Sequence, residues 1–303
     1  MNTGLDQYMD IFKDTVEDSA TKLTKSFEKI FIEVIILFMV IPRKINFTQM
    51  GRYGLHVEQT YRNAFGLKKS KCIDWLKLNV SLAKRFLGKQ GRWAIAIDPS
   101  YISKAGKKTP HIGRFWSGCA QSVKHGLEIM GIGLIDIDTK DCMMLRAHQS
   151  LNNKELSLRN KTMVDFYISV IKRYRKELLK LSTLIVADAY FSTSTFVNGI
   201  KKEGGGSLIS RFRDAKGYTG LMDCQARDKW KLDFAFNASF TSLNVAKVTM
   251  KEMGMEYSMS SFKSLMTNIY LVRRIFKACG YIPNRTLISK IFKDLSCLQR
   301  IAA

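Results

Sequence analysis

Two short apolar runs, each followed at once by an aspartate, constrain the fold more than any other feature of this sequence. Residues 93–97 precede Asp98, and residues 184–187 precede Asp188. Apolar runs of this length are typical of strands that are buried on both faces of a sheet. Such strands need helices on both sides, so the sequence predicts an α/β domain.

The regions around these two runs complete a mixed sheet. Between them the sequence favours two further strands with glycine punctuation and one long amphipathic helix. After the second run it favours a short helix and a last strand. These five elements are predicted at residues 112–120, 126–137, 156–181, 194–202 and 207–212. The predicted architecture is a mixed sheet flanked by helices.

Helical patterns precede and follow the sheet, so we expect three regions. Apolar residues recur every three or four positions up to about residue 90, and the chain favours helix again from about residue 232 onward. The predicted division is a helical region at residues 1–90 that is a candidate for DNA binding, the α/β domain at 91–270, and a helical tail at 271–303.

The most apolar stretch, residues 30–41, is expected to be a buried helix. It is 12 residues long and contains Glu33, whereas a helix that spans a bilayer needs about 20 apolar residues. The first 20 residues are rich in acids and do not have the basic start of a secretory signal. We therefore expect a cytoplasmic protein without a membrane partner.

Two short helices broken near Gly54 are expected within the first region. Residues 47–53 and 57–63 have the lengths of a helix-turn-helix motif. A plain helical hairpin explains the same pattern equally well, because the motif has no fixed spacing. In a helix-turn-helix, the side chains available to a DNA groove would be Gln59, Arg62 and Asn63.

The charge balance favours a polyanionic partner. The chain has 49 Lys and Arg residues against 26 Asp and Glu residues, which gives a formal net charge of +23. A surplus this large repels itself unless an anion neutralises part of it. Nucleic acid is the commonest such partner, since each cation placed at a phosphate releases condensed counterions. Charge alone also fits a merely basic cytosolic or ribosome-associated protein.

The two aspartates indicate where chemistry would take place. If both apolar strands are central and parallel, Asp98 and Asp188 lie side by side outside the carboxyl ends of their strands, where open α/β sheets bind ligands. Paired carboxylates suit Mg²⁺ or Mn²⁺, and two such ions can activate a nucleophile and stabilise the leaving oxygen in phosphoryl transfer. An aspartate after a strand is also a common turn former, and Asp98-Pro99-Ser100 has good turn chemistry.

Both aspartate segments resemble the first two acidic motifs of the DDE transposases that bacterial insertion sequences encode. This resemblance covers roughly residues 45–270. It implies a ribonuclease-H-like fold, as in retroviral integrases, with Asp98 and Asp188 as catalytic residues and metal ligands. It also implies divalent-metal cleavage and strand transfer at terminal inverted repeats, with a possible homodimer on DNA. The segments that carry the resemblance are 96–104, 115–119, 186–191, 213–217 and 224–227.

The third acid of this family is missing from its expected place. In the subgroup with a Tyr-Arg-Glu-Lys signature, two, three and six residues separate successive members. Lys216 fits the last position, but the three earlier positions hold Lys202, Gly205 and Ile209. The predicted last strand is joined directly to a segment that resembles the middle of the glutamate helix. We therefore interpret the chain as carrying an internal deletion that removed the third acid.

No other acid is a convincing replacement, so the third carboxylate is unknown. Glu203 lies on the wrong side of its strand, Glu252 is better explained as a solvated residue, and Glu256 lies in the same late helical region. With two carboxylates we expect weak metal binding, retained DNA binding, and impaired or absent cleavage and strand transfer. Two alternatives remain open: a non-catalytic relic or competitor of intact transposase, and a nuclease of the same fold that cuts RNA–DNA hybrids or junctions.

Cations near these motifs are the expected DNA contacts. Lys104, Lys107 and Lys108 follow the first aspartate motif, and Arg213 and Lys216 belong to the segment that resembles the glutamate helix. Side chains of this kind position DNA through its phosphates without reading its sequence. A solvated basic turn explains the three lysines equally well. DNA binding would place the protein at the nucleoid.

Overall fold

The computed structural model describes most of the chain and contains both the sheet and its helical base. The residues that it describes are 4–19, 23–42, 44–88, 91–106, 108–191, 193–202, 206–208 and 226–280.

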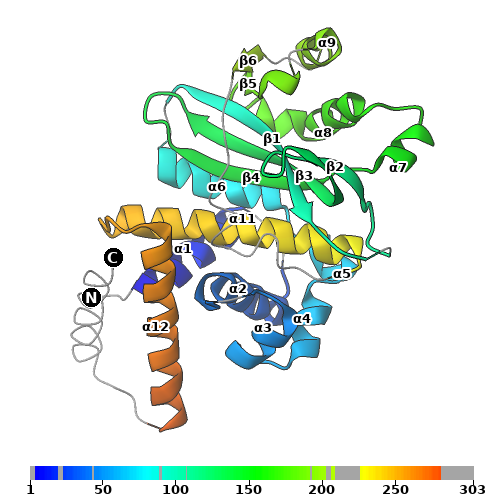
Figure 1. The fold of residues 1–303 in the computed structure, drawn as a ribbon. Helices are drawn as coiled ribbons and strands as arrows, with labels where there is room; N and C mark the ends of the chain where they lie inside the picture. Colours follow the sequence, from blue (N-terminus) through cyan, green and yellow to red (C-terminus); the bar gives the residue numbers. More distant parts are fainter. Residues whose placement is uncertain are drawn as a thin grey trace.

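A mixed sheet of six strands forms the upper layer in Figure 1. Its central part has the order β4-β3-β1-β5-β6, and β2 continues the β4 side of β3. Strands β1, β3 and β4 are antiparallel neighbours, whereas β5 and β6 run parallel to β1. This is the ribonuclease-H-like arrangement, so the predicted fold class is confirmed. The strands are β1 (Trp93–Ser103), β2 (Gly113–Ser117), β3 (Ser122–Asp136), β4 (Cys142–Gln149), β5 (Leu184–Val186) and β6 (Gly206–Leu208).

The sequence-based boundaries of the first apolar strand and of the long helix were wrong. β1 does not end before Asp98, because its pairing with β3 continues to Ser103 and places Asp98 opposite Gly131. The long helix predicted from residue 156 is instead two helices, α7 (Asn153–Ser157) and α8 (Met163–Leu178). A capping box between Thr162 and Asp165 begins α8 as a separate helix. The side chain of each residue accepts a hydrogen bond from the backbone N–H of the other.

The sequence pattern did not predict strand β4. Contacts along the outer edge of this strand stabilise it. Helix α11 (Lys229–Glu252) lies along this edge and presents two buried asparagines to it. The side chain of Asn244 bonds to both the N–H and the C=O of Met144, and the side chain of Asn237 does the same for Ala147. These amides take the place of a further strand, so the edge is satisfied and covered.

Helices cover both faces of the sheet (Figure 1). Helices α8 and α9 (Ser194–Lys202) lie on one side, and α6 (Trp75–Leu87) and α11 lie on the other. Helices α1 (Gly4–Asp18), α2 (Lys25–Val40) and α12 (Met259–Ala278) pack beneath α11. One hydrophobic cluster includes Phe31, Trp75 and Phe234, and thus joins residues on either side of the division expected near residue 90.

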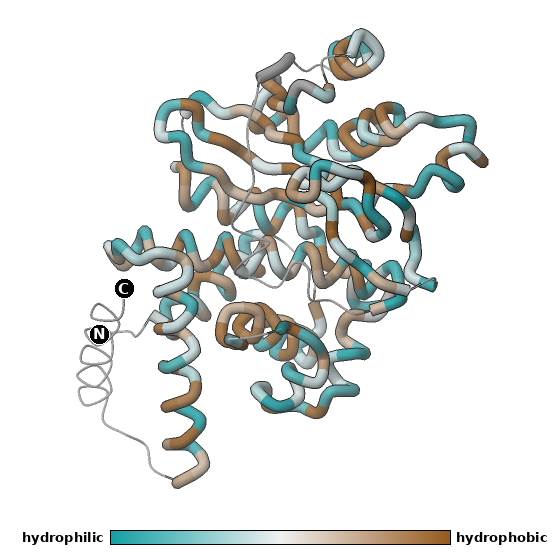
Figure 2. Tube along the Cα trace, in the orientation of Figure 1, coloured by the Kyte–Doolittle hydropathy of each residue, from teal (hydrophilic) through white to brown (hydrophobic). Residues whose placement is uncertain are grey.

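Helix α2 is the buried helix expected at residues 30–41. Its side chains from Phe31 to Val40 are all buried, and Figure 2 shows the hydrophobic colour concentrated there. Its one buried acid, Glu33, accepts hydrogen bonds from the Tyr61 hydroxyl at 2.7 Å and from the backbone of Leu55 at 2.5 Å. Among the described residues, no helix is both long enough and apolar enough to cross a membrane.

The helix pair expected around Gly54 is present as α3 (Phe47–Tyr53) and α4 (Glu58–Ala64). A Cβ added at Gly54 would lie 1.9 Å from the hydroxyl oxygen of Tyr61 and 2.7 Å from the carbonyl oxygen of Met50. The turn therefore needs glycine because of close approach.

We expect Gly54→Ala to lower the free energy of unfolding by about 1–3 kcal/mol, because the added methyl group displaces Tyr61 from Glu33. Urea denaturation would measure the loss. Gly118→Ala is the matched control, since a Cβ at residue 118 meets nothing within 4 Å. Equal stabilities of the two variants would contradict this explanation of the turn.

Candidate active site

Asp98 and Asp188 follow neighbouring parallel segments at the same offset, Asp98 within β1 and Asp188 two residues after the end of β5. The register of β1 against β5 pairs Ala96 with Val186. Each aspartate lies two residues beyond its member of that pair. The expectation that the two apolar strands are adjacent and parallel is therefore confirmed.

The Asp188 carboxylate begins a turn. It is exposed, and its Oδ1 atom accepts a hydrogen bond of 3.0 Å from the backbone N–H of Tyr190 at the start of a 3₁₀ turn, η1 (Ala189–Phe191). This bond is the turn-forming role that the sequence allowed for an aspartate. Because a carboxylate has several lone pairs, one N–H bond leaves acceptor capacity for a second partner.

Asp98 is half-buried within β1 and has a different setting. The Ser100 hydroxyl donates to its Oδ2 atom at 3.2 Å. Its cross-strand partner is Gly131, where an added Cβ would lie 3.4 Å from the Asp98 carbonyl oxygen and 3.9 Å from the ring of Phe240 on α11. Since side chains alternate along a strand, Asp98 lies on the α11 face and its neighbour Pro99 on the α8 face.

A cavity of about 490 Å³ opens beside Asp188 on the α8 face. Glu128 and Pro99 line it from the sheet, and Arg114 lines it from β2. The cavity size is typical of a ligand site. Its aromatic lining comprises Phe115, Trp116, Tyr167, Tyr190 and Phe191, of which Trp116 and Tyr190 are each 57% exposed.

Glu128 is a carboxylate of this cavity that sequence reasoning missed. It is 8% exposed, and the Tyr167 hydroxyl donates to its Oε1 atom at 2.6 Å. Burial raises the pKa of Glu128, the hydrogen bond from Tyr167 opposes the rise, and the charge of Asp98 adds to it. The available signal was a single acid within an otherwise apolar run, residues 127–134.

Tyr167→Phe is expected to lower the free energy of unfolding by about 1–3 kcal/mol, because it leaves the buried Glu128 carboxyl without this donor. Thermal or urea unfolding would measure the change. Tyr101→Phe is the control, since the Tyr101 hydroxyl donates at 2.7 Å to the carbonyl oxygen of His125 at the surface. A loss as large in the control variant would argue against a special role for the Glu128 contact.

The predicted DNA contacts lie only partly within the described residues. Lys104 and Lys108 are described, whereas Lys107, Arg213 and Lys216 lie outside. Lys104 is half-buried and Lys108 is exposed. Because β1 extends to residue 103, Lys104 follows Asp98 by six residues of extended chain, or about 20 Å. Lys104 therefore lies farther from Asp98 than a turn directly after Asp98 would have placed it.

The described residues supply no third metal ligand. They contain no group of three or more His, Cys, Asp or Glu side chains arranged to hold a metal ion. Ile209 and Glu203 lie outside the described residues. Glu252 has a structural role at the end of α11, where it accepts hydrogen bonds from Arg85 at 2.9 Å and from Gln7 at 3.0 Å.

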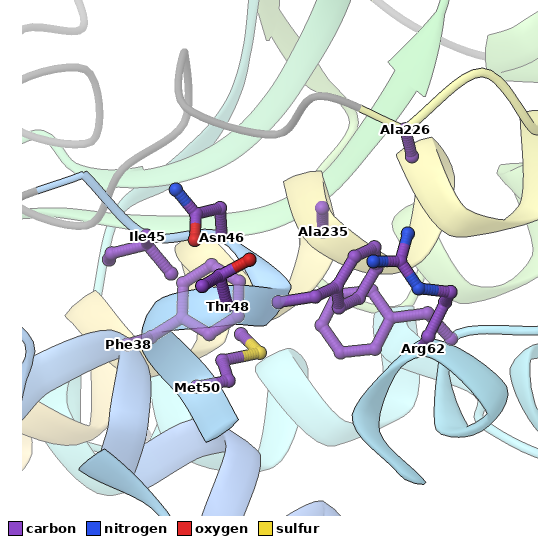
Figure 3. A pocket seen from close by; sticks show the side chains of 10 residues that line it. Phe38, Ile45, Asn46, Thr48, Met50, Arg62, Ala226 and Ala235 are labelled. Atoms are coloured by element: carbon purple, nitrogen blue, oxygen red, sulfur yellow. The ribbon is translucent and has the colours of Figure 1, made fainter. Parts of the chain in front are cut away.

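The residues expected to face a DNA groove on α4 bond to one another. Gln59 donates to Asn63 at 2.8 Å. Arg62 pairs with Glu58, and its guanidinium lies 4.8 Å from the centre of the Phe47 ring. Figure 3 shows Arg62 at a small cavity of about 210 Å³ bounded by α2, α3, α4 and α11. The motif thus has internal contacts that a DNA groove would have to replace.

Comparisons with known proteins provide limited information. No protein-family model and no curated protein matches the chain. One solved structure with a related shape is a cryo-EM structure of the piggyBac transposase synaptic complex with hairpin DNA. It has a TM-score of 0.43 and 12% sequence identity, over 96% of this chain and 84% of that one. A likeness of this degree does not establish a shared function.

Proposed function

We propose that this chain is a DNA transposase of the insertion-sequence type that binds the ends of its element at the nucleoid. The observation that carries the proposal is the position of Asp98 and Asp188, each two residues beyond the paired residues Ala96 and Val186 of neighbouring parallel strands in a ribonuclease-H-like sheet. The net charge of +23 supports a DNA partner.

The two aspartates would hold one divalent ion only weakly, because Asp98 lies on the α11 face of the sheet whereas Asp188 lines the cavity on the α8 face. Mg²⁺ is commonly bound through one or two carboxylates, with phosphate oxygens and water completing its shell. Asp98 and Asp188 would supply the two carboxylates, and Asp188 has acceptor capacity beyond its bond to Tyr190. When bound, Mg²⁺ or Mn²⁺ would polarise the scissile phosphate and lower the pKa of a bound water or hydroxyl. Arg114 lies in the same cavity as Asp188, where it would orient a DNA phosphate.

Catalysis by this copy is expected to be impaired. The described residues offer no third ligand to hold a second ion, and strand transfer depends on accurate placement of the attacking oxygen. DNA binding does not need this third ligand, so it should persist. A DNA-binding competitor of intact transposase is therefore the second candidate function, because it requires the fold and the charge alone.

The test combines Mn²⁺ titration calorimetry with cleavage of the element's own terminal repeats. The wild-type chain is expected to bind Mn²⁺ weakly, and Asp98→Asn and Asp188→Asn should each lose that binding while DNA binding persists. Asp138→Asn is the matched control, because Asp138 is an exposed carboxylate paired with Arg92. Mn²⁺ binding that survives both site substitutions would refute the proposed ligands. Efficient cleavage abolished by Asp98→Ala would show that a third ligand exists.

A further inference from the structure

Two lysines from distant parts of the chain converge on one indole ring. Helix α5 (Leu67–Ser70) lies beside the start of α11, at the lower right of the sheet in Figure 1. The ammonium group of Lys71, just after α5, lies 5.5 Å from the centre of the Trp230 ring. The ammonium group of Lys229 lies 5.9 Å from the same centre. Cation–π attraction stabilises each position.

Among the described residues, no carboxylate forms an ion pair with the two lysines at the Trp230 ring, Lys71 and Lys229. The Asp228 carboxylate instead caps α11 by accepting hydrogen bonds from the N–H groups of Trp230 and Lys231. Asp233, one turn later, pairs with Arg146. Both adjacent acids are therefore engaged elsewhere.

Further cations extend the same surface. Lys68 on α5 and Arg227 before α11 are both exposed. We call the four side chains Lys68, Lys71, Arg227 and Lys229 the Trp230 corner. Burial and the charges of Arg146, Arg173 and Lys229 lower the pKa of His148 to about 3, which is consistent with a concentration of cations on this side of β4. A bound anion would stabilise the like charges of Lys71 and Lys229, which one ring holds on the same surface.

We propose that the Trp230 corner binds the phosphate backbone of duplex DNA, outside the Asp98–Asp188 site. The Trp230 indole is only half-exposed, and both ammonium groups lie close to its ring. We therefore infer that the ring positions the two lysines and does not stack on a DNA base. A surface made of cations without hydrogen-bonding amides contacts the phosphates of DNA and does not distinguish one base sequence from another. The inference rests on the proposed function, since it identifies where the DNA that reaches the active site is also held.

The experiment measures how DNA affinity depends on salt. Binding of a fluorescein-labelled random-sequence duplex of about 30 base pairs would be followed by anisotropy between about 50 and 200 mM NaCl. Each phosphate contact contributes about 0.9 to the slope of log K against log salt. The double variant Lys71→Gln/Lys229→Gln should therefore have a slope smaller in magnitude by about 1.8. Between the lowest and highest salt concentrations, its affinity should fall by a factor about tenfold smaller than that of the wild-type chain.

Two further variants make the result specific. Lys71→Arg/Lys229→Arg keeps both charges and should retain the wild-type slope. Lys13→Gln/Lys84→Gln removes the same charge near the other end of α11, where Arg85 meets Glu252, and should also leave the slope nearly unchanged. Circular dichroism would establish that all variants are folded.

The outcomes separate this inference from the proposed function. A reduced slope in the glutamine variant alone supports the Trp230 corner. An unchanged slope in that variant, with wild-type binding intact, overturns the corner and leaves the proposed function standing. Binding of the wild-type chain to duplex RNA but not to duplex DNA of the same length overturns both. Wild-type binding to neither duplex also overturns both.

Discussion

Asp233→Asn is expected to lower the free energy of unfolding by about 3–5 kcal/mol, because it leaves a cation without its counter-ion in the protein interior. Arg146 on β4 is 13% exposed and Asp233 on α11 is 18% exposed, and their side chains are joined at 2.9 and 3.1 Å. Burial tends to lower the pKa of Arg146, but Asp233 and Tyr174 more than offset this, so Arg146 stays protonated. Urea denaturation at neutral pH would measure the loss.

A double variant distinguishes the pair from the charge that remains. Arg146→Met/Asp233→Leu replaces both ions by apolar groups of similar shape, and we expect it to be close to wild type in stability. Asp138→Asn removes the partner of exposed Arg92 and should have almost no effect. If the double variant were as unstable as Asp233→Asn, the loss would come from packing and hydrogen bonds, and not from an unpaired charge.

The sequence predicted those parts of the fold that depend on local pattern. The apolar runs at 93–97 and 184–187 are parallel neighbours with residues 94–97 and 185–186 buried, and the buried helix at 30–41 is present as α2. These predictions succeeded because a short apolar run or a long amphipathic stretch can bury its apolar side chains in only a few kinds of secondary structure. The ribonuclease-H-like fold was implied by the resemblance of the two aspartate segments and not by these patterns.

The sequence did not predict structural features that depend on contacts between residues far apart in the chain. Strand β4 reads as a mixture of polar and apolar residues, and it becomes a strand because β3 pairs with one edge while Asn237 and Asn244 bond to the other. The extension of β1 past Asp98 likewise follows from its pairing with β3. Neither contact has a local signature.

The same distinction applies to the candidate site. Asp98 and Asp188 stood out because each follows an apolar run, and their strands are indeed neighbours. Glu128 was overlooked because its importance comes from Tyr167, which lies 39 residues later in the chain. The Trp230 corner was overlooked for a similar reason, since α5 and α11 are far apart in sequence and meet only in the folded chain.

Acidification from about pH 7 to about pH 4.5 is expected to destabilise the folded state by roughly 2–3 kcal/mol through His148 alone. Burial and then the charges of Arg146, Arg173 and Lys229 lower its pKa from 6.5 to about 3. The unfolded chain therefore takes up this proton near pH 6.5, whereas the folded chain does not until about pH 3. Between these values the unfolded state binds more protons, so stability falls as pH falls.

His148→Leu isolates this contribution, because leucine has a similar volume and does not titrate. His148 packs near the rings of Phe166 and Tyr174, and its Nδ1 atom has no hydrogen-bond partner among the described residues, so an apolar side chain suits the position. Urea denaturation at the two pH values would give the pH dependence of each protein. The variant should lose roughly 2–3 kcal/mol less than wild type on acidification. Equal losses in both proteins would mean that His148 is protonated in the folded state, and that the cations around it lie farther away or are better screened.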